Sequence, residues 1–313
     1  TDSIINYRRS LKRRNYSRYT IRNYMSTLKQ CIIWLKVPIE TACHRDLVDF
    51  IDYLLAKRLT PKTINCYLDC IRGFYDYLIH DEQIAMQNPV KPGDTLRMSK
   101  PLPRFLHDAQ VRRLFAQIDD PRDLAIFTLM LRCGLRVEEV AKLTLAAVDF
   151  KRGQVFVYHG KGARERVVYL SKDAYQRLLA YLEVRPAARA KRLFLVSKGR
   201  YRGRPLNVRG IQHRMKYYAQ KAGFKVTCHQ LRHTMATQML NADADLVTIQ
   251  DLLGHNWITT TQKYCKLSNL KVQRDYFKAM RRVQQRYVQP AINPMFDHEK
   301  GEKERLCLTF TKI

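Results

Sequence analysis

Apolar residues recur every three or four positions in the first part of the chain, a spacing that predicts amphipathic helices. One stripe comprises Ile21, Met25, Leu28, Ile32 and Leu35, and a second comprises Leu47, Phe50, Ile51, Leu54 and Leu55. Thr20 is the expected cap of the first of these helices. A third helix is expected to begin with Thr60 as its cap and Pro61 in its first turn. Its buried face comprises Ile64, Leu68, Ile71, Tyr75 and Leu78, so residues 1–88 are predicted to form a small helical bundle.

A proline-rich segment separates this bundle from the rest of the chain. Residues 89–104 contain Pro89, Pro92, Gly93, Pro101 and Pro103 among basic residues, a composition that interrupts helices and strands alike. We interpret the segment as a linker that lets two domains close around a duplex. An ordinary connecting loop accounts for any single residue in it equally well.

The second domain, residues 105–285, combines helices with one β-like stretch. Helical patterns cover Ala109–Ile118 and Asp123–Arg132, the stretch Gln154–Tyr169 reads as a hairpin, and helices dominate the remainder. The expected fold class is therefore mainly α, of the α+β type, with a small antiparallel sheet in the second domain.

Residues 286–313 read as a tail. In it Leu306, Leu308 and Phe310 alternate with polar residues, which suits a short strand. Such a tail either docks on a neighbouring subunit or is a frayed terminus.

The charge balance points to a polyanionic partner. The 313 residues include 57 Lys and Arg against 28 Asp and Glu, a net charge of +29. This excess is far more than solubility needs, and the cations spread along the whole chain, which favours a long nucleic-acid surface over a single basic tail. A merely soluble basic protein is the alternative.

The cysteines and the apolar runs bear on compartment and cofactors. The 8 Cys include no CxxC pair, and Cys66 and Cys70 are spaced as neighbours on one helix face, so we interpret the cysteines as reduced core thiols and expect neither a metal nor a cofactor. No charged start followed by a long apolar run marks a signal peptide, and the longest apolar stretch, Leu124–Leu131, is too short to span a bilayer. We expect a cytoplasmic protein without membrane partners.

Two segments of the second domain offer cations suited to phosphate chemistry. Cleavage of a phosphodiester without a metal needs a nucleophile, cations for the transition state and an acid for the leaving oxygen. Arg136 follows Gly134, which can end one helix, and starts the next, where its guanidinium can hold two phosphate oxygens. Glu139 lies one turn further along, placed to hold an Arg or a His. His229 and Arg232 are three positions apart at another helix start, which also favours a phosphate.

The nucleophile and the acid have candidates as well. Gly254 can end a helix, and His255 follows it directly. Nine positions later stands Tyr264, behind the threonines 259–261, which suit a new helix start that returns the phenol to the same space. Lys161 lies between two glycines at the hairpin tip, where an ammonium can reach a leaving oxygen.

Taken singly, these residues fit structural roles at least as well. Arg136 with Glu139 suits a surface ion pair, and His229 suits a cap or a packed ring. Tyr264 suits core packing, and Lys161 suits a solvated turn. Only their common order along the chain distinguishes a catalytic set from these alternatives.

That order resembles the tyrosine recombinase (phage integrase) family. The resemblance rests on Cys133-Gly-Leu-Arg136-Val-Glu-Glu139-Val, Gly-Lys161-Gly, His229-Gln-Leu-Arg232-His-Thr, Leu253-Gly-His255 and Thr260-Thr-Gln-Lys-Tyr264. It covers residues 106–285, and the helical first domain is similar to the family's SAM-like core-binding domain by pattern. Cys265 and the long basic tail are less typical of the family and leave the subfamily open.

The resemblance implies a role for each residue. Tyr264 would attack the scissile phosphate and form a 3′-phosphotyrosyl intermediate. Arg136, Arg232 and His255 would bind the nonbridging oxygens, and Lys161 would protonate the leaving 5′ oxygen. His229 would assist proton transfer or hydrogen-bond the phosphate, and Glu139 would brace the cluster. Because the covalent bond stores the phosphodiester energy, the resemblance implies no cofactor.

The resemblance also implies partners and a role in the cell. We expect double-stranded DNA carrying specific recombination sites, a homo-tetramer on that DNA, accessory DNA-bending proteins and association with the nucleoid. The strong positive charge favours the integration, excision or transposition of a mobile element. A type IB topoisomerase, which uses a similar set of Arg, Lys, His and Tyr, is an alternative, as is a DNA-binding regulator that cuts nothing.

Overall fold

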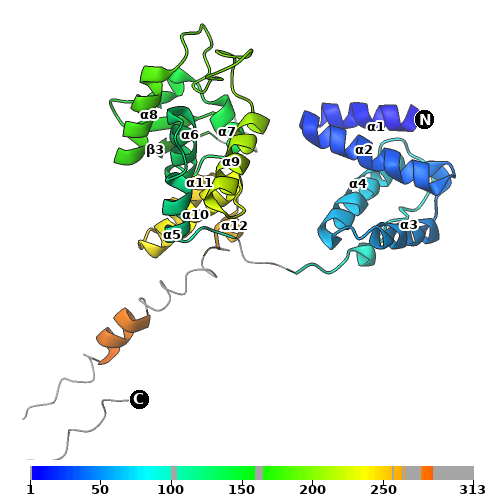
Figure 1. Cartoon of the computed structure of the whole chain (residues 1–313). Helices are drawn as coiled ribbons and strands as arrows, with labels where there is room; N and C mark the ends of the chain where they lie inside the picture. The colour runs from blue at the N-terminus through cyan, green and yellow to red at the C-terminus, as the bar shows by residue number, and fades with distance from the viewer. Residues whose placement is uncertain are drawn as a thin grey trace, which may run out of the picture. The chain divides into compact units, whose positions relative to one another are not determined.

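The computed structural model describes residues 2–99, 104–158, 165–255, 257–262, 264 and 276–284. The chain forms two compact units, Thr1–Pro101 and Leu102–Ile313, each considered by itself (Figure 1). Helices account for 62% of the structure, and the described strands form one three-stranded antiparallel sheet. The prediction of a mainly α fold with a small sheet is confirmed.

The first unit is a bundle of helices with an apolar interior. It contains α1 (Asp2–Arg13), α2 (Arg18–Leu35), α3 (His44–Ala56) and α4 (Pro61–His80), with single 3-10 turns η1 (Ile39–Thr41) and η2 (Pro92–Asp94). Helix α2 contacts each of the other three helices (Figure 1). The predicted face of α4 is buried throughout, as expected for the helix that forms one wall of the core.

Two details of this unit differ from the sequence prediction. The hydroxyl of Ser17, not of Thr20, caps α2 and accepts the backbone N–H of Thr20, so the helix begins one turn earlier than predicted. Leu55 lies on the solvent side of α3, 43% exposed, because it is rotated by about 100° around the helix from the buried Leu54. Thr60 and Pro61 start α4 as predicted.

Part of the predicted linker packs on the first unit. The side-chain amide of Asn65 donates to the carbonyl of Leu96 and accepts the N–H of the same residue, both at 2.9 Å. Such a pair of bonds fixes the backbone around residue 96 against α4. Residues 100–103 of the predicted linker lie outside the described residues.

The second unit is built around the buried helix α6. Its helices are α5 (Asp108–Phe115), α6 (Pro121–Arg132), α7 (Val137–Lys142), α8 (Lys172–Val184), α9 (Val208–Ala222), α10 (Cys228–Asn241), α11 (Leu246–Leu253) and α12 (Ile258–Gln262), with the 3-10 turn η3 (Leu145–Ala147). Helix α6 contacts α8 and α10, its strongest neighbours (Figure 1). A further helical segment covers residues 276–284.

A small sheet extends the second unit beside these helices. Strands β1 (Val148–Asp149), β2 (Gln154–Val157) and β3 (Arg166–Tyr169) are antiparallel in that order, and β2 pairs with β3 from Gln154 opposite Tyr169 to Val157 opposite Arg166. The predicted hairpin is thus present, and β1 adds a strand that the sequence prediction lacked. The tip of the hairpin, residues 159–164, lies outside the described residues, as does the predicted tail 286–313.

One buried ion-pair network fastens α9 to α6. The carboxylate of Asp123, 0% exposed, accepts bonds from Arg122 and Arg214 and from the hydroxyl of Tyr218. Burial of these charges is tolerated because each has a partner of opposite sign or a hydrogen-bond donor. The network holds the second unit together away from the candidate site.

The cysteine interpretation was correct only in part. Cys31, Cys70, Cys133 and Cys228 are buried free thiols, as predicted, whereas Cys43 and Cys66 are free but exposed. Cys66 and Cys70 therefore differ in environment, because Cys70 faces the core of the first unit and Cys66 faces solvent.

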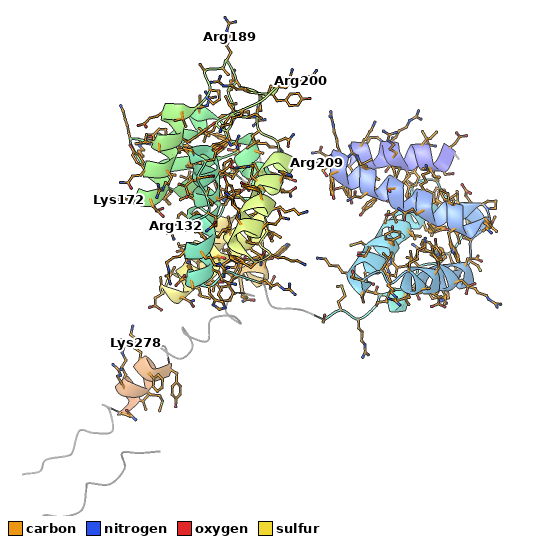
Figure 2. All side chains as sticks on the ribbon, in the orientation of Figure 1. Arg132, Lys172, Arg189, Arg200, Arg209 and Lys278 are labelled. Carbon is orange, nitrogen blue, oxygen red and sulfur yellow. The ribbon has the colours of Figure 1, made fainter. Side chains whose placement is uncertain are left out.

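The surface carries the basic residues. Arg189, Arg200 and Arg209 point outward from the second unit and are exposed (Figure 2). In the first unit, Arg8, Lys12, Arg18 and Arg22 line a groove on α1 and α2 together with Ile21 and Met25. Among the described residues, no helix has the length and apolar character needed to cross a membrane.

Candidate active site

The turn between α6 and α7 fixes the first candidate residue. Gly134 follows α6 with a φ of +63°, and a Cβ there would lie 2.9 Å from Leu253 Cδ2, so glycine suits both the backbone conformation and the packing. Arg136 is the N-cap residue of α7, as predicted. Glu139, one turn later, accepts the backbone N–H of Arg136 at 2.7 Å and its Nη1 at 2.9 Å. The guanidinium of Arg136 is thereby held at a helix start.

Glu139 also holds a second arginine. The Nη1 and Nη2 atoms of Arg166, the first residue of β3, donate to the two carboxylate oxygens at 2.8 Å each, and its Nε donates to the carbonyl of Leu252. Burial raises the pKa of Glu139, but the bonds and charges of Arg166 and Arg136 outweigh it and lower the pKa to about 2. Glu139 is therefore a fixed anion that braces two guanidiniums.

Arg232 lies deeper, with only 1% of its surface exposed. It projects from α10. Its guanidinium donates to the carbonyl of Gly134, in the turn between α6 and α7, and to the carbonyl of Leu253, the residue before Gly254. Burial and then the nearby positive charge of Arg136 lower the pKa of Arg232 to about 9. It remains protonated at neutral pH, held by carbonyl dipoles.

Two imidazoles share this positive surrounding. His229 stands in the first turn of α10, and burial followed by the charges of Arg232 and Arg136 lowers its pKa. His255 follows Gly254, the left-handed residue that ends α11, and the same causes lower its pKa to about 3. Both rings are therefore neutral at physiological pH and can donate one N–H each.

Tyr264 is brought into the same cluster by α12. Its side chain is 2% exposed, its ring stacks on that of His255 with centroids 6.5 Å apart, and its hydroxyl lies 2.7 Å from Nδ1 of His233. Burial raises the pKa of the phenol, while Arg232 and Arg136 lower it and offset part of that effect. The phenol is thus protonated in the free protein, close to the two arginines.

The arginines open onto a pocket. Its volume is about 280 Å³, and its lining includes Arg136, Arg232, His229 and Lys142 together with Glu139 and Tyr158. The carboxylate of Glu139 already holds two guanidiniums, and the lining also contains the carboxylate of Glu138; Arg136, Arg232 and Lys142 exceed these two anions by one positive charge. Such a pocket suits a phosphate group. Among the described residues, no cluster of His, Cys, Asp and Glu has the arrangement of a metal site.

The structure therefore gathers most of the predicted site residues. It brings together Arg136, Glu139, His229, Arg232, His255 and Tyr264. Lys161 lies outside the described residues. Sequence reasoning missed Arg166 and His233. His233 had a usable signal, because it lies one helical turn beyond His229 on α10. Arg166 had no such signal, because its contact with Glu139 joins two elements far apart in the sequence.

Comparison with known proteins assigns the family. The model of the phage integrase family matches residues 104–270, and the model of the phage integrase N-terminal SAM-like domain matches residues 4–82. Tyrosine recombinase XerC of Bacillus subtilis is 32% identical over 280 residues, which cover 84% of this chain and 90% of the relative. Tyrosine recombinase XerD of Pseudomonas aeruginosa is 35% identical over 261 residues, covering 80% and 87% respectively.

A solved structure shares the fold at lower identity. A lambda integrase tetramer bound to a Holliday junction is similar with a TM-score of 0.69 and 16% identity, over 84% of this chain and 76% of that chain. The family models, the two recombinases and the arrangement of the site agree. The chain belongs to the phage integrase family of tyrosine recombinases.

Proposed function

We propose that this recombinase cuts and rejoins DNA strands at specific sites through a covalent 3′-phosphotyrosyl intermediate formed on Tyr264. The observation that carries the proposal is the position of the Tyr264 phenol within the positive field of Arg136 and Arg232. Their charges offset part of the rise in its pKa that burial causes. Positive charge beside a phenol favours its oxyanion and also attracts the phosphate that it attacks.

In this proposal the cations of the pocket bind the scissile phosphate. Arg136 and Arg232 hold the nonbridging oxygens, where negative charge develops as Tyr264 attacks. Glu139 keeps Arg136 in place through the bonds described above. The cost of removing one such donor is on the order of 3–4 kcal/mol of transition-state stabilisation.

The neutral imidazoles act as hydrogen-bond donors. The hydroxyl of Thr261 lies 2.9 Å from Nδ1 of His255. We assign the bond to a donating hydroxyl, because this leaves the proton of the neutral ring on Nε2, free to bind a nonbridging oxygen. His229 hydrogen-bonds the phosphate from α10, and Lys161 protonates the leaving 5′ oxygen.

Covalent trapping tests the proposal. A nicked suicide substrate loses the short 5′-hydroxyl fragment after cleavage, so the phosphotyrosyl adduct accumulates and is counted on a denaturing gel. Tyr264→Phe should give no adduct while it binds DNA as the wild type does. Tyr158→Phe is the matched control, because Tyr158 is a tyrosine that lines the pocket and is 51% exposed. Adduct formation by Tyr264→Phe would overturn the assignment of the nucleophile. So would loss of the adduct in Tyr158→Phe when Tyr264→Phe still forms it.

Recombination between two sites, in a homo-tetramer on the DNA, is the proposed reaction. Mixing two differently labelled sites should give exchanged products, whereas a topoisomerase would relax supercoiled DNA and leave the labels where they were. A DNA-binding regulator would give neither product. The tail, residues 286–313, is proposed to dock on a neighbouring subunit of this tetramer.

The biological role is proposed to be movement of a mobile element within nucleoid DNA. Its support is the net charge of +29, which suits extensive contact with DNA. Sequencing the DNA captured in the covalent complex should return the ends of such an element. Recovery of one fixed chromosomal site in strains without mobile elements would contradict the role and leave the chemistry intact.

A further inference from the structure

The hydroxyl of Tyr264 has a partner outside the predicted catalytic set. Nδ1 of His233 lies 2.7 Å from it, within the range of a strong hydrogen bond, and the two ring centroids are 5.6 Å apart. His233 is the residue after Arg232 on α10. Its ring lies edge-to-face with that of His229, with centroids 4.3 Å apart, so α10 presents both imidazoles to the same space.

The nucleophile must lose a proton, and the surrounding groups limit where it can go. Arg232 and Arg136 are cations, and His255 has a neutral ring whose Nδ1 is 2.9 Å from the hydroxyl of Thr261. The side chain of Tyr264 is 2% exposed, which keeps bulk water away from the phenol. Among the described residues, the phenolic oxygen has a hydrogen bond to the Nδ1 atom of His233, which accepts the phenolic proton in the tautomer that carries the ring proton on Nε2.

We propose that His233 is the proton acceptor for Tyr264. During cleavage the Tyr264 oxygen forms its bond to phosphorus and passes its proton to Nδ1 of His233, while the phosphorus–O5′ bond breaks and O5′ takes a proton from the general acid proposed above. During resealing the 5′-hydroxyl returns its proton to that general acid and attacks phosphorus, the phosphorus–tyrosine bond breaks, and His233 returns its proton to the phenol. This inference rests on the proposed function, because it assigns a proton within the same reaction.

The electrostatic surroundings make this transfer depend on DNA. Without a bound anion, an imidazolium at His233 would add a third positive charge to those of Arg232 and Arg136, which is unfavourable. A bound phosphate places negative charge between these groups and stabilises the imidazolium. The proton is therefore expected to move only when a phosphate is present.

The groups that can influence the imidazole come from several elements. Helix α10 itself carries Arg232 and His229, the α7 start carries Arg136, β3 carries Arg166, and the segments after α11 and α12 carry His255 and Tyr264. Helices α6 and α11 also pack on α10. The charged residues of α6 are paired with one another or with Arg214 and Asp173, and Asp251 of α11 is exposed.

The central test separates proton transfer from simple positioning. In His233→Asn the amide occupies the place of Nδ1 and can hold the phenol by a hydrogen bond, but it cannot take the proton. We expect unchanged DNA binding and thermal stability, and single-turnover adduct formation slowed by about 100-fold, the usual effect of losing a general base. His213→Asn, at an exposed position of α9, is the matched control and should cleave normally.

Two outcomes of this test overturn the proposal. Wild-type cleavage by His233→Asn would mean that the imidazole only positions the phenol. Faster cleavage by His233→Ala would mean that the contact restrains an otherwise reactive nucleophile. If the wild-type protein forms no adduct, the proposed function itself is wrong. This outcome differs from the other two because it is seen with the wild-type protein, before any variant is compared.

Further measurements keep the proposal testable if a variant folds poorly. Added imidazole should restore part of the cleavage rate of His233→Ala, and the rate of His233→Asn should keep rising with pH where the wild type reaches a plateau. In the unmodified protein, ¹⁵N NMR should find Nδ1 of His233 without a proton, as an acceptor must be. A protonated Nδ1 in the neutral ring would reject the assignment directly.

Discussion

Replacement of Glu139 by Gln tests the electrostatic framework of the site. The carboxylate accepts bonds from Arg166 and Arg136, and its side chain is only 5% exposed. Its pKa falls from an ordinary value of 4.5 to about 2. Because one pKa unit corresponds to about 1.4 kcal/mol, the ionised carboxylate contributes about 3 kcal/mol to folding at neutral pH. This agrees with the cost of about 3–5 kcal/mol for breaking a buried ion pair.

The direction of the pH dependence follows from the lowered pKa. A carboxylate whose pKa is lower in the folded state stabilises the protein above its ordinary pKa, and this contribution is lost as the pH falls toward about 2. The difference in unfolding free energy between wild type and Glu139→Gln should therefore be about 3 kcal/mol at neutral pH and about 1 kcal/mol near pH 3.

Urea denaturation at a series of pH values measures this difference. Glu138→Gln is the control, because Glu138 is the exposed neighbour and loses the same charge; its effect should stay within about 0.5 kcal/mol. A Glu139→Gln variant as stable as Glu138→Gln at neutral pH would refute the reasoning. So would a difference that does not change between neutral pH and pH 3.

Three further predictions concern other parts of the molecule. Gly134→Ala should lower the free energy of unfolding by more than Gly153→Ala, because both have a left-handed φ, worth about 1–2 kcal/mol, but only at Gly134 would the new Cβ meet a neighbour, at 2.9 Å; equal effects in thermal unfolding would contradict this. Asp123→Asn should cost about 3–5 kcal/mol in chemical denaturation, because it removes the anion shared by Arg122 and Arg214 and leaves the buried Arg122 only the contact with Asp120 at 3.9 Å; a loss below 1 kcal/mol would contradict the role of the network. Arg18→Ala with Arg22→Ala, in the basic groove of the first unit, should reduce the slope of log affinity for DNA against log salt by about 2; an unchanged slope would remove the groove from the DNA interface.

The sequence predicted those elements whose signals are local. Thr60 and Pro61 mark the start of α4, and Gly134 and Gly254 mark helix ends, because caps and left-handed glycines depend on a few neighbouring residues. The cap of α2 was wrongly predicted at Thr20, because the local signal there fits two residues equally well. Ser17 and Thr20 are both competent caps, and only the backbone conformation decides between them.

The sequence indicated which residues lie together in the candidate site, but not the contacts between them. The positions of Arg136, Glu139 and Arg232 follow from motif order, whereas the bonds of Arg166 to Glu139 join residues far apart in the chain. A strand arginine after a turn usually faces solvent, and nothing in its neighbours indicates that this one reaches a carboxylate on another element. Such contacts depend on tertiary packing, which local spacing does not determine.

Burial is the largest cause of the pKa shifts of Arg232, His255 and Tyr264. It lowers the pKa of Arg232 and His255, and the neighbouring positive charges lower them further; it raises the pKa of Tyr264, which therefore keeps its proton. An anion in the pocket would oppose the crowding of positive charge and raise the pKa of Arg232 and His255. The free protein therefore holds Tyr264, the proposed nucleophile, in the protonated state, and in the proposed mechanism the bound phosphate stabilises the imidazolium that receives its proton.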